Sequence, residues 1–414
     1  MTGNWKVCAQ LSTSHSSLAA LDASRMEETV RKVTQAVDLD LLVVGFREGP
    51  DIFRWFLSPT RPVRDVFLWY GVLSDIEGME DSDLVVNWKG ERSRGWGGWA
   101  GKGAEVEETF RFACPNNPAT REKTLRRLRE LMSRYAFSGV FLDKIRFPSP
   151  ANGIDEALSC FCDHCRRAAR VAGLNLDAVA RILAERAVKL PSLADGSRIE
   201  AHRWPETIAS ADPILSHFLK FRSESIAGLV AELAEAAREL GRAVALDLFS
   251  PCLSSLVGQD YPRVCRHCAW AKPMTYRIAQ GPAGLRLEIP ALIEGLARLF
   301  NLDERRALDW CARHIQAFEW DLVERTREEA VPLRFIEAEI EAAVRATHPV
   351  PVYFGLELVS QPGVIDVTPA DVRAMVGAGR AANAAGLVIS WDLMHAPMDG
   401  VEALAEAIGR PFGG

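Results

Sequence analysis

Eight short apolar runs, separated by longer stretches with helical periodicity, constrain the fold of this chain more than any other feature. Most of the runs are continuously aliphatic or β-branched and do not alternate between apolar and polar residues. Continuous apolar runs are typical of parallel strands that are buried on both faces of a sheet. We therefore expect strands over residues 5–11, 39–46, 66–75, 139–147, 243–251, 270–276, 351–360 and 386–393.

The stretches between these runs have the amphipathic pattern of helices, and several carry start signals such as Asp212-Pro213 and Thr368-Pro369. The expected helices cover residues 24–37, 117–135, 156–172, 213–240, 286–300, 303–345 (as two or more helices), 369–379 and 400–409. Eight strand–helix units in sequence predict an α/β fold, a (β/α)8 TIM barrel. An open doubly wound sheet is the main alternative, but no G-x-G-x-x-G motif follows the first strand.

Three connections in this pattern are long. A chain of 414 residues is compatible with two or three domains of about 150 residues each, and also with one barrel that carries insertions. We predict a single barrel domain over residues 1–414, with long inserted βα loops at about 76–116, 148–212 and 277–350. Structured insertions after barrel strands usually build the rim of an active site.

Charge and hydropathy exclude several classes of function. The formal net charge is −6 and no basic patch is visible, which argues against a nucleic-acid partner. No apolar run reaches the length of about 18 residues that a membrane span needs. The first residues lack the pattern of a signal peptide, so we expect a cytoplasmic protein. The oligomeric state stays open, and a homo-oligomer is among the partners we allow for.

Carboxylates stand at the ends of several predicted strands. Asp143, Asp247, Glu357 and Asp392 occupy this position in four different strands. The chemistry of a TIM barrel lies at the C-terminal ends of its strands. Acids gathered around one pocket repel each other and raise each other's pKa, which destabilises the fold. Such a group is therefore expected where the acids have a function. The alternative is that each acid pairs with a nearby base or caps a helix; for the set as a whole we favour a site.

Aromatic side chains accompany these acids. Tyr276 and Trp391 lie at strand ends, while Trp96 and Trp99 lie in a glycine-rich loop; Arg146 follows Asp143 on the fourth strand. Flat aromatic faces beside carboxylates suit a sugar ring, although the loop tryptophans could instead only pin their loop. Two carboxylates on either side of a glycosidic bond are what its hydrolysis needs. We therefore predict a carbohydrate substrate.

A cysteine cluster in the segment SCFCDHC suggests a metal site. Cys160, Cys162 and Cys165 have C-x-C-x-x-C spacing, and Cys114 is the candidate fourth ligand. Four thiolates make a tetrahedral Zn²⁺ site that is structural, because no position is left for a catalytic water. Redox or unligated thiols are the alternative. Cys265 and Cys268 are also spaced for metal, but we interpret them as ordinary buried thiols.

Several short motifs resemble a known group of barrels. These are the C-P-N-N-P segment at Cys114, the strand GVFLDKIRFPSP before the cysteine cluster, and the segments VGQDYPRVC, WAKPMTYR and GLVISWDLMHAP. They resemble the zinc-bearing family 42 β-galactosidases and, more closely, uncharacterised glycoside-hydrolase-like TIM barrels, over roughly residues 110–277 and the end of the chain. The resemblance implies a structural zinc beside the site, held by Cys114, Cys160, Cys162 and Cys165.

The same resemblance bears on the catalytic residues. The β-galactosidases carry Asn-Glu at the end of strand four, whereas this chain has Asp143-Lys144, so the resemblance implies only the broader class of glycosidases. Glu357 occupies strand seven, where such barrels hold the nucleophile. Our preferred assignment makes Asp143 the general acid/base and Glu357 the nucleophile. A second assignment makes Asp143 the nucleophile and Asp247 the acid. In either, Arg146, Tyr276, Trp391 and Asp392 orient the substrate or tune the acids.

Two other functions remain as alternatives. A non-catalytic carbohydrate-binding barrel would have the same pocket and tryptophans without a working pair of acids. A metal-dependent hydrolase of the amidohydrolase kind would need an H-x-H motif after the first strand, where this chain has only His15.

Overall fold

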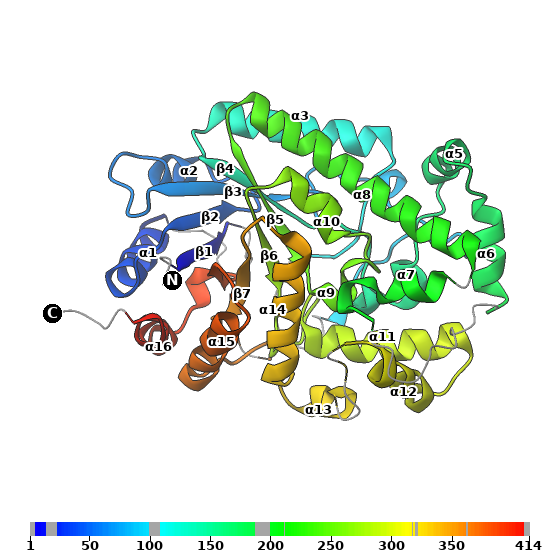
Figure 1. The fold of residues 1–414 in the computed structure, drawn as a ribbon. Helices are drawn as coiled ribbons and strands as arrows, with labels where there is room; N and C mark the ends of the chain where they lie inside the picture. Colours follow the sequence, from blue (N-terminus) through cyan, green and yellow to red (C-terminus); the bar gives the residue numbers. More distant parts are fainter. Residues whose placement is uncertain are drawn as a thin grey trace.

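The computed structural model describes residues 5–13, 23–98, 108–186, 199–210, 212–316, 318, 322–361 and 363–409. Its strands form one parallel sheet at the centre of the molecule, in the order β6-β5-β4-β3-β2-β1-β8-β7 (Figure 1). The strands are β1 (Lys6–Ser12), β2 (Leu41–Gly45), β3 (Asp65–Gly71), β4 (Gly139–Asp143), β5 (Ala243–Phe249), β6 (Trp270–Met274), β7 (Tyr353–Glu357) and β8 (Gly386–Ser390).

The sheet closes between β6 and β7. Ala271 forms a parallel bridge with Val352, and its N–H donates to the carbonyl of Pro351 at 3.1 Å. Pro273 in β6 has no N–H to continue this ladder, which accounts for the weak pairing at the seam. The prediction of a (β/α)8 TIM barrel is confirmed, because eight parallel strands wrap into a nearly closed barrel with helices around it.

The expected helix over 156–172 is interrupted where the chain passes through Cys160 and Cys162. The stretch 303–345 was expected to form two or more helices, and its described part contains three. The helices between strands include α1 (Ala23–Ala36), α2 (Pro50–Phe56), α3 (Pro118–Arg134), α8 (Pro213–Glu239), α14 (Leu333–Thr347), α15 (Pro369–Ala381) and α16 (Met398–Ile408). The rim carries α4 (Ile154–Ala157), α5 (Asp163–Val171), α6 (Leu176–Ala184), α7 (Trp204–Ala209), α9 (Pro251–Ser254), α10 (Tyr261–Val264), α11 (Leu285–Phe300), α12 (Glu304–His314) and α13 (Leu322–Glu328).

Capping residues set the starts of these helices as predicted. The Asp212 side chain accepts hydrogen bonds from the N–H groups of Ile214 and Leu215 at the start of α8. Thr368 and Asp371 form a reciprocal capping box at the start of α15. Gly241, at φ +69°, follows the end of α8 in the left-handed conformation that favours glycine.

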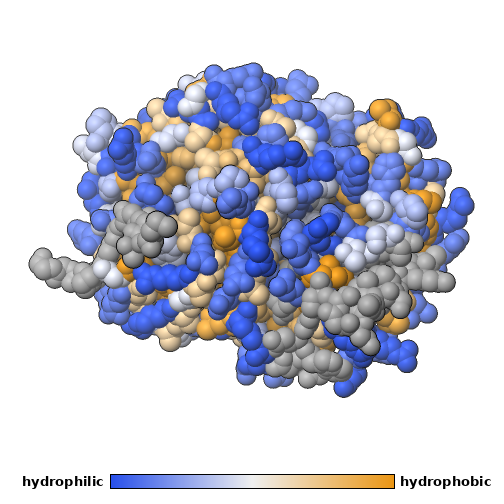
Figure 2. Space-filling model, viewed as in Figure 1, coloured by the Kyte–Doolittle hydropathy of each residue, from blue (hydrophilic) through white to orange (hydrophobic). Residues whose placement is uncertain are grey.

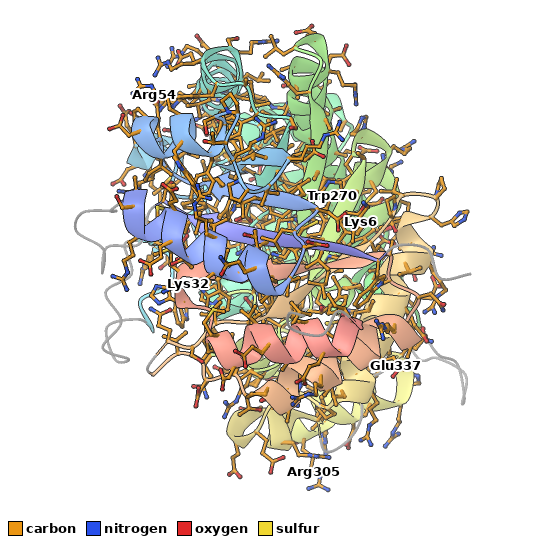
Figure 3. The ribbon with its side chains drawn as sticks, turned by 90° about the vertical axis from the view of Figure 1, so that its left-hand side faces the viewer. Lys6, Lys32, Arg54, Trp270, Arg305 and Glu337 are labelled. Carbon is orange, nitrogen blue, oxygen red and sulfur yellow. The ribbon has the colours of Figure 1, made fainter. Side chains whose placement is uncertain are left out.

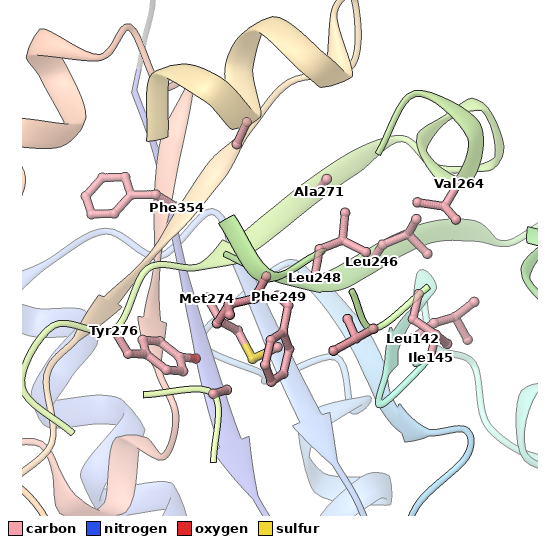
Figure 4. Packing of buried hydrophobic residues seen from close by; sticks show 14 of the residues in the cluster. Leu142, Ile145, Leu246, Leu248, Phe249, Val264, Ala271, Met274, Tyr276 and Phe354 are labelled. Carbon is pink, nitrogen blue, oxygen red and sulfur yellow. The ribbon is translucent and has the colours of Figure 1, made fainter. Parts of the chain in front are cut away.

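Side chains alternate between two apolar regions along each strand. Outward residues such as Leu142, Leu246 and Leu248 pack against the helices, and Figure 4 shows part of this core. Inward residues fill the barrel itself, namely Cys8, Leu41, Val43, Phe67, Trp69, Phe141, Ala245, Trp270 and Val388. The barrel is therefore a packed core, and open space is left at the ends of its strands.

Buried carboxylates tie the rim connections together. Glu288 on α11 accepts hydrogen bonds from Ser149 Oγ at 2.8 Å and from the N–H of Ala151 at 2.9 Å, which links the connection after β6 to the one after β4. Glu339 on α14 likewise accepts from Ser250 Oγ at 2.7 Å, just after β5. Buried acids need such partners to offset the loss of hydration. The rim is thus anchored by polar contacts as well as by apolar packing.

The outer faces of the helices are polar. Lys32, Arg54 and Arg305 lie on these faces (Figure 3), and the side of the molecule in Figure 2 is largely hydrophilic, with apolar residues in small groups. Within the ranges that the structure describes, no helix combines the length and apolar character needed to cross a bilayer.

Candidate functional site

A cavity of about 100 Å³ opens at the C-terminal end of the barrel. It brings together five of the residues predicted from the sequence: Asp143, Asp247, Arg146, Tyr276 and Trp391. The other side chains in its wall include Gln10, Trp69, Glu108, Phe110, Lys144, Phe249, Met274 and Gln361. The cavity therefore combines acids, cations and aromatic rings, as a polar substrate with apolar faces requires.

Strand register makes Asp143 and Asp247 neighbours. Phe141 of β4 pairs with Ala245 of β5, and the two acids each lie two residues further along their strands. Phe141 and Ala245 both point into the barrel, so the period of two turns both acids inward as well. Adjacent strands lie about 4.8 Å apart. The two carboxylates thus enter the cavity side by side.

Asp143 is held from two sides. Its Oδ2 accepts a hydrogen bond from Trp69 Nε1 at 2.9 Å, and its Oδ1 accepts one from the N–H of Lys144 at 2.5 Å. Lys144 is turned away by a left-handed backbone at φ +55°, and its Nζ donates to Asp75 Oδ2 at 2.7 Å. A non-glycine residue in this conformation is strained, which is a feature of functional sites. The orientation of the Asp143 carboxylate is therefore fixed.

Asp247 is almost fully buried and only partly satisfied. Its Oδ2 accepts from Lys272 Nζ at 3.0 Å, whereas its Oδ1 has no hydrogen-bond partner among the described residues. Burial raises the pKa of Asp247 to about 7, and nearby Asp143 adds to the effect of burial while Lys272 opposes it. A carboxyl group with this pKa is substantially protonated near neutrality and can act as an acid.

Lys272 connects several parts of the site below the cavity. It is fully buried in β6, and besides Asp247 its Nζ donates to Gln10 Oε1 and to Tyr276 Oη, both at 2.7 Å. Burial lowers the pKa of Lys272, and Asp247 partly offsets this. Lys272 was not among the residues predicted from the sequence. A lysine in an otherwise apolar strand, two positions after Trp270, could have indicated a buried charge.

Aromatic rings form much of the cavity wall. Tyr276 and Trp391 meet edge to face with ring centroids 5.8 Å apart. Phe249, Met274 and Tyr276 gather at the ends of β5 and β6, as Figure 4 shows. Arg146 lies with its guanidinium 4.1 Å from the ring centroid of Phe249. These faces offer the stacking surface that a sugar ring uses.

Glu108 is a further acid that the sequence analysis missed. It lies in the connection after β3, lines the cavity and stands 3.5 Å from Lys144 Nζ. Burial raises the pKa of Glu108, and Asp75 and Asp143 add to this while Lys144 opposes it. No sequence signal marked it, because it belongs to a rim connection and follows no strand directly.

Glu357, the predicted nucleophile, does not line the cavity. Its carboxylate accepts hydrogen bonds from the N–H groups of Arg277 at 2.7 Å, Ile278 at 3.0 Å and Ala279 at 2.8 Å. It is 1% exposed and is not among the residues that line the cavity. Burial raises its pKa to about 7, against these hydrogen bonds. The structure therefore gives Glu357 the role of holding the chain after β6 and does not bring it to the acids of the cavity.

Two other predicted substrate-binding residues, Asp392 and Trp96, are not among the residues that line the cavity. Asp392 is fully buried, and its Oδ1 accepts from the N–H groups of Ser12 and Met394, both at 3.2 Å, so it caps a turn, as the alternative interpretation stated. Trp96 is half-buried and packs against the main core. Trp99 falls outside the described residues.

The four predicted metal ligands converge. The sulfurs of Cys114, Cys160, Cys162 and Cys165 all lie within 4.8 Å of one another, and Cys114 Sγ is 3.4 Å from Cys165 Sγ and 3.5 Å from Cys162 Sγ. All four are free thiols. Tetrahedral zinc with Zn–S bonds of about 2.3 Å separates its sulfurs by about 3.8 Å. The cluster fits such an ion.

The surroundings of the cluster suit thiolates. Backbone N–H groups of Val86 and Asn116 point at Cys160 Sγ and Cys114 Sγ, each at 3.4 Å. The guanidinium of Arg222, fully buried, donates to the carbonyl of Ser159 at 2.6 Å and places a positive charge beside the cluster. Donors and a nearby cation stabilise the negative charge of a tetrathiolate site. Cys265 and Cys268 belong to no group of three candidate ligands in the described part of the chain.

The cluster also joins two rim connections. Cys114 lies on the connection after β3, four positions beyond the cavity residue Phe110, while the other three cysteines follow β4. The N–H of Phe161 donates to the carbonyl of Val86 at 2.7 Å across the same junction. An ion here would fix the wall of the cavity that contains Glu108 and Phe110.

Comparisons with known proteins bear on the fold. No protein-family model matches this chain, and neither does any curated protein. Among solved structures, the glycoside hydrolase domain of PgaB (BpsB) from Bordetella bronchiseptica is similar with a TM-score of 0.56 at 13% sequence identity, over 98% of this chain and 99% of that chain. At this identity, the likeness shows the barrel fold alone.

Weaker likenesses add no argument. The catalytic domain of beta-amylase from Paenibacillus polymyxa has a TM-score of 0.49 at 8% identity, over 96% of this chain and 94% of that chain. The chitinase from Chromobacterium violaceum ATCC 12472 has a TM-score of 0.45 at 9% identity, over 98% of this chain and 99% of that chain. The predicted resemblance to family 42 β-galactosidases receives no specific support from these matches.

Proposed function

We propose that this protein is a glycoside hydrolase that cleaves O-glycosidic bonds of a carbohydrate substrate. The observation that carries the proposal is that Asp143 and Asp247 enter one aromatic-walled cavity from neighbouring strands. Such a pair of carboxylates is the requirement of glycosidic hydrolysis. That the barrel resembles one described as a glycoside hydrolase domain supports the proposal through the fold alone.

We assign Asp247 as the general acid. Its raised pKa keeps a proton available near neutrality, and its buried Oδ1 has no hydrogen-bond partner among the described residues. Glu357 is less suited to the reaction than the sequence pattern indicated, because it does not line the cavity and three backbone N–H groups hold it after β6. The roles therefore follow the second of the two sequence-based assignments.

We assign Asp143 as the nucleophile. Side chains from adjacent strands favour the short carboxylate separation of about 5–5.5 Å that retaining enzymes use. An oxygen of Asp143 attacks the anomeric carbon while the glycosidic bond breaks and the proton of Asp247 passes to the leaving oxygen. Water then attacks the glycosyl–Asp143 ester, Asp247 takes up the proton of the water, and Asp143 is released.

We further propose that the cysteine cluster holds a structural Zn²⁺. The ion would join the connections after β3 and β4 and keep Glu108 and Phe110 in the cavity wall. Four thiolates leave the metal no open position for water, so the catalytic steps belong to the carboxylates.

The test is a screen of nitrophenyl glycosides and polysaccharides with the parent protein, Asp143→Asn and Asp247→Asn. We expect turnover by the parent with retention of anomeric configuration, measured by NMR, and loss of about a thousandfold or more in Asp143→Asn. The matched control is Asp51→Asn, whose side chain is 89% exposed on α2, and it should behave as the parent. Binding without turnover by the parent would favour the non-catalytic carbohydrate-binding barrel instead.

A further inference from the structure

Lys144, Arg146 and Lys272 are the buried cations in or beside the cavity, and among the described residues Arg146 has no carboxylate at ion-pair distance. Lys144 pairs with Asp75 at 2.7 Å, and Lys272 pairs with Asp247 at 3.0 Å. Arg146, which lines the cavity, has no carboxylate within 4.0 Å in the part of the chain that the structure describes. A buried cation without a partner is costly to a fold, so this one needs an explanation.

The hydrogen bonds of Arg146 are also incomplete. It is 3% exposed, and its single hydrogen bond within the described ranges runs from Nη1 to the carbonyl of Phe147 at 3.0 Å. The rings of Phe112 and Phe249 lie 4.3 and 4.1 Å from the guanidinium and hold it in place without accepting its N–H groups. A guanidinium has five N–H donors. Most of its donors are therefore left for a ligand in the cavity.

We propose that Arg146 binds the carboxylate of an acidic sugar, so that the substrate carries uronic acid residues. This inference rests on the proposed glycosidase function and names the substrate class of the same cavity. Arginine presents a planar fork of N–H groups that matches the two oxygens of a carboxylate. A sugar hydroxyl could accept one of these hydrogen bonds, but it would leave the guanidinium without a carboxylate in direct contact.

The charges around the cavity favour a monoanion over a more highly charged group. Glu288, Asp143 and Asp247 stand close enough to Arg146 to act on its charge. A phosphate would carry up to two negative charges toward these acids and would be repelled. A carboxylate carries one charge and is flat, which suits a site about 100 Å³ in volume between aromatic rings. A sulfated sugar is the remaining anionic ligand, and the experiment includes it.

Binding to the Asp143→Asn variant tests the inference without turnover. Calorimetry would compare trisaccharides of galacturonic, glucuronic and mannuronic acid with neutral trisaccharides of galactose, glucose and mannose and with a sulfated galactan oligosaccharide. We expect at least one acidic trisaccharide to bind about tenfold or more tightly than its neutral counterpart, as one hydrogen-bonded ion pair provides. Neutral sugars binding equally well, or the sulfated one binding best, would overturn the proposal.

Substitutions of Arg146 test whether this residue causes the preference for acidic sugars. Arg146→Gln and Arg146→Lys in the Asp143→Asn background should lose about tenfold or more of the affinity for the acidic sugar and little of that for the neutral one. The control is Arg298→Gln, an exposed arginine on α11 whose side chain is 53% accessible. If the Arg146 variants fail to fold, competition in the Asp143→Asn protein decides: free uronates should displace a bound acidic trisaccharide, and the matching neutral sugars should not.

The outcomes separate this inference from the proposed function. Tight binding of acidic sugars by a parent without turnover would refute the glycosidase and retain the role of Arg146. Turnover of neutral glycosides alone would retain the glycosidase and refute the acidic substrate.

Discussion

The indole Nε1 of Trp69 donates a hydrogen bond to Asp143 Oδ2 over 2.9 Å, joining inward side chains of the adjacent strands β3 and β4. The N–H of Lys144 donates to the other oxygen of the same carboxylate. In the mechanism that we propose, Asp143 is the nucleophile. A carboxylate held from two sides keeps one orientation toward the sugar, so less freedom of motion has to be lost on the way to the transition state. We therefore expect the loss of this hydrogen bond to lower the rate of the reaction.

Trp69→Phe should lower kcat by about ten- to hundredfold, because the ring remains while a hydrogen bond to a charged group is lost. The substrate affinity should change less, since the aromatic wall is largely kept. Steady-state kinetics with the parent and the variant measures both. Trp270→Phe, inside the same barrel and stacked on Phe141, controls for the loss of ring volume. An unchanged kcat in Trp69→Phe would mean that the contact does not serve catalysis.

The pH dependence of kcat/KM should show the titration of Asp247. In the mechanism that we propose, Asp247 acts in its protonated form; since its pKa is raised to about 7, kcat/KM should be maintained on the acid side and fall about tenfold per pH unit above about 7. Asp247→Asn should remove this alkaline limb along with most of the activity. A profile that rises with pH through this range would show that Asp247 acts as a base.

Lys272→Met should move the alkaline limb upward by roughly one pH unit or more. Lys272 lowers the pKa of Asp247 against the effect of burial, so its removal lets that pKa rise further. A purely structural role for the lysine would lower stability and leave the limb in place. Lys220→Met, on the exposed side of α8, is the matched control for the lost charge.

Glu357→Gln distinguishes a residue that holds a loop from a nucleophile. The amide keeps one acceptor oxygen and turns an NH₂ group toward backbone N–H donors, so we expect a loss of about 2–3 kcal/mol in the free energy of unfolding. Activity well below the melting temperature should stay within about tenfold of the parent. Glu339→Gln, a buried acid of the same kind on α14, is the control. A loss of about a thousandfold with intact folding would restore Glu357 as the nucleophile.

Cys114→Ser should remove the metal. We expect about one zinc per chain in the parent by elemental analysis, and little in the variant, because three thiolates bind zinc more weakly than four. The melting temperature should fall as well, and chelation of the parent should reproduce the fall. Cys311→Ser, a buried thiol on α12 outside the cluster, should retain the zinc. A metal-free parent with the same stability in the presence of a chelator would contradict the proposal.

Local patterns were sufficient to predict the barrel and the cysteine site. The continuous apolar character of the runs depends on burial of both faces of each strand, and this can be recognised within a few residues of sequence. The spacing of Cys160, Cys162 and Cys165 is likewise typical of metal ligands, and it predicted that their sulfurs would lie close together. Both inferences concern neighbours in the chain, and the structure brings Cys114 to join them.

The positions of the acids at the strand ends could be read from the chain alone, whereas the acids that share the cavity became known from the folded structure. Asp247 and Glu357 look alike in the sequence, yet one keeps an oxygen unpartnered among the described residues while backbone N–H groups bind the other. The partners of a buried group come from distant segments. Lys272, for example, donates a hydrogen bond to Gln10, which lies 262 positions away in the sequence. Desolvation and hydrogen bonding, which set the role of an acid, exist only after those segments have packed together.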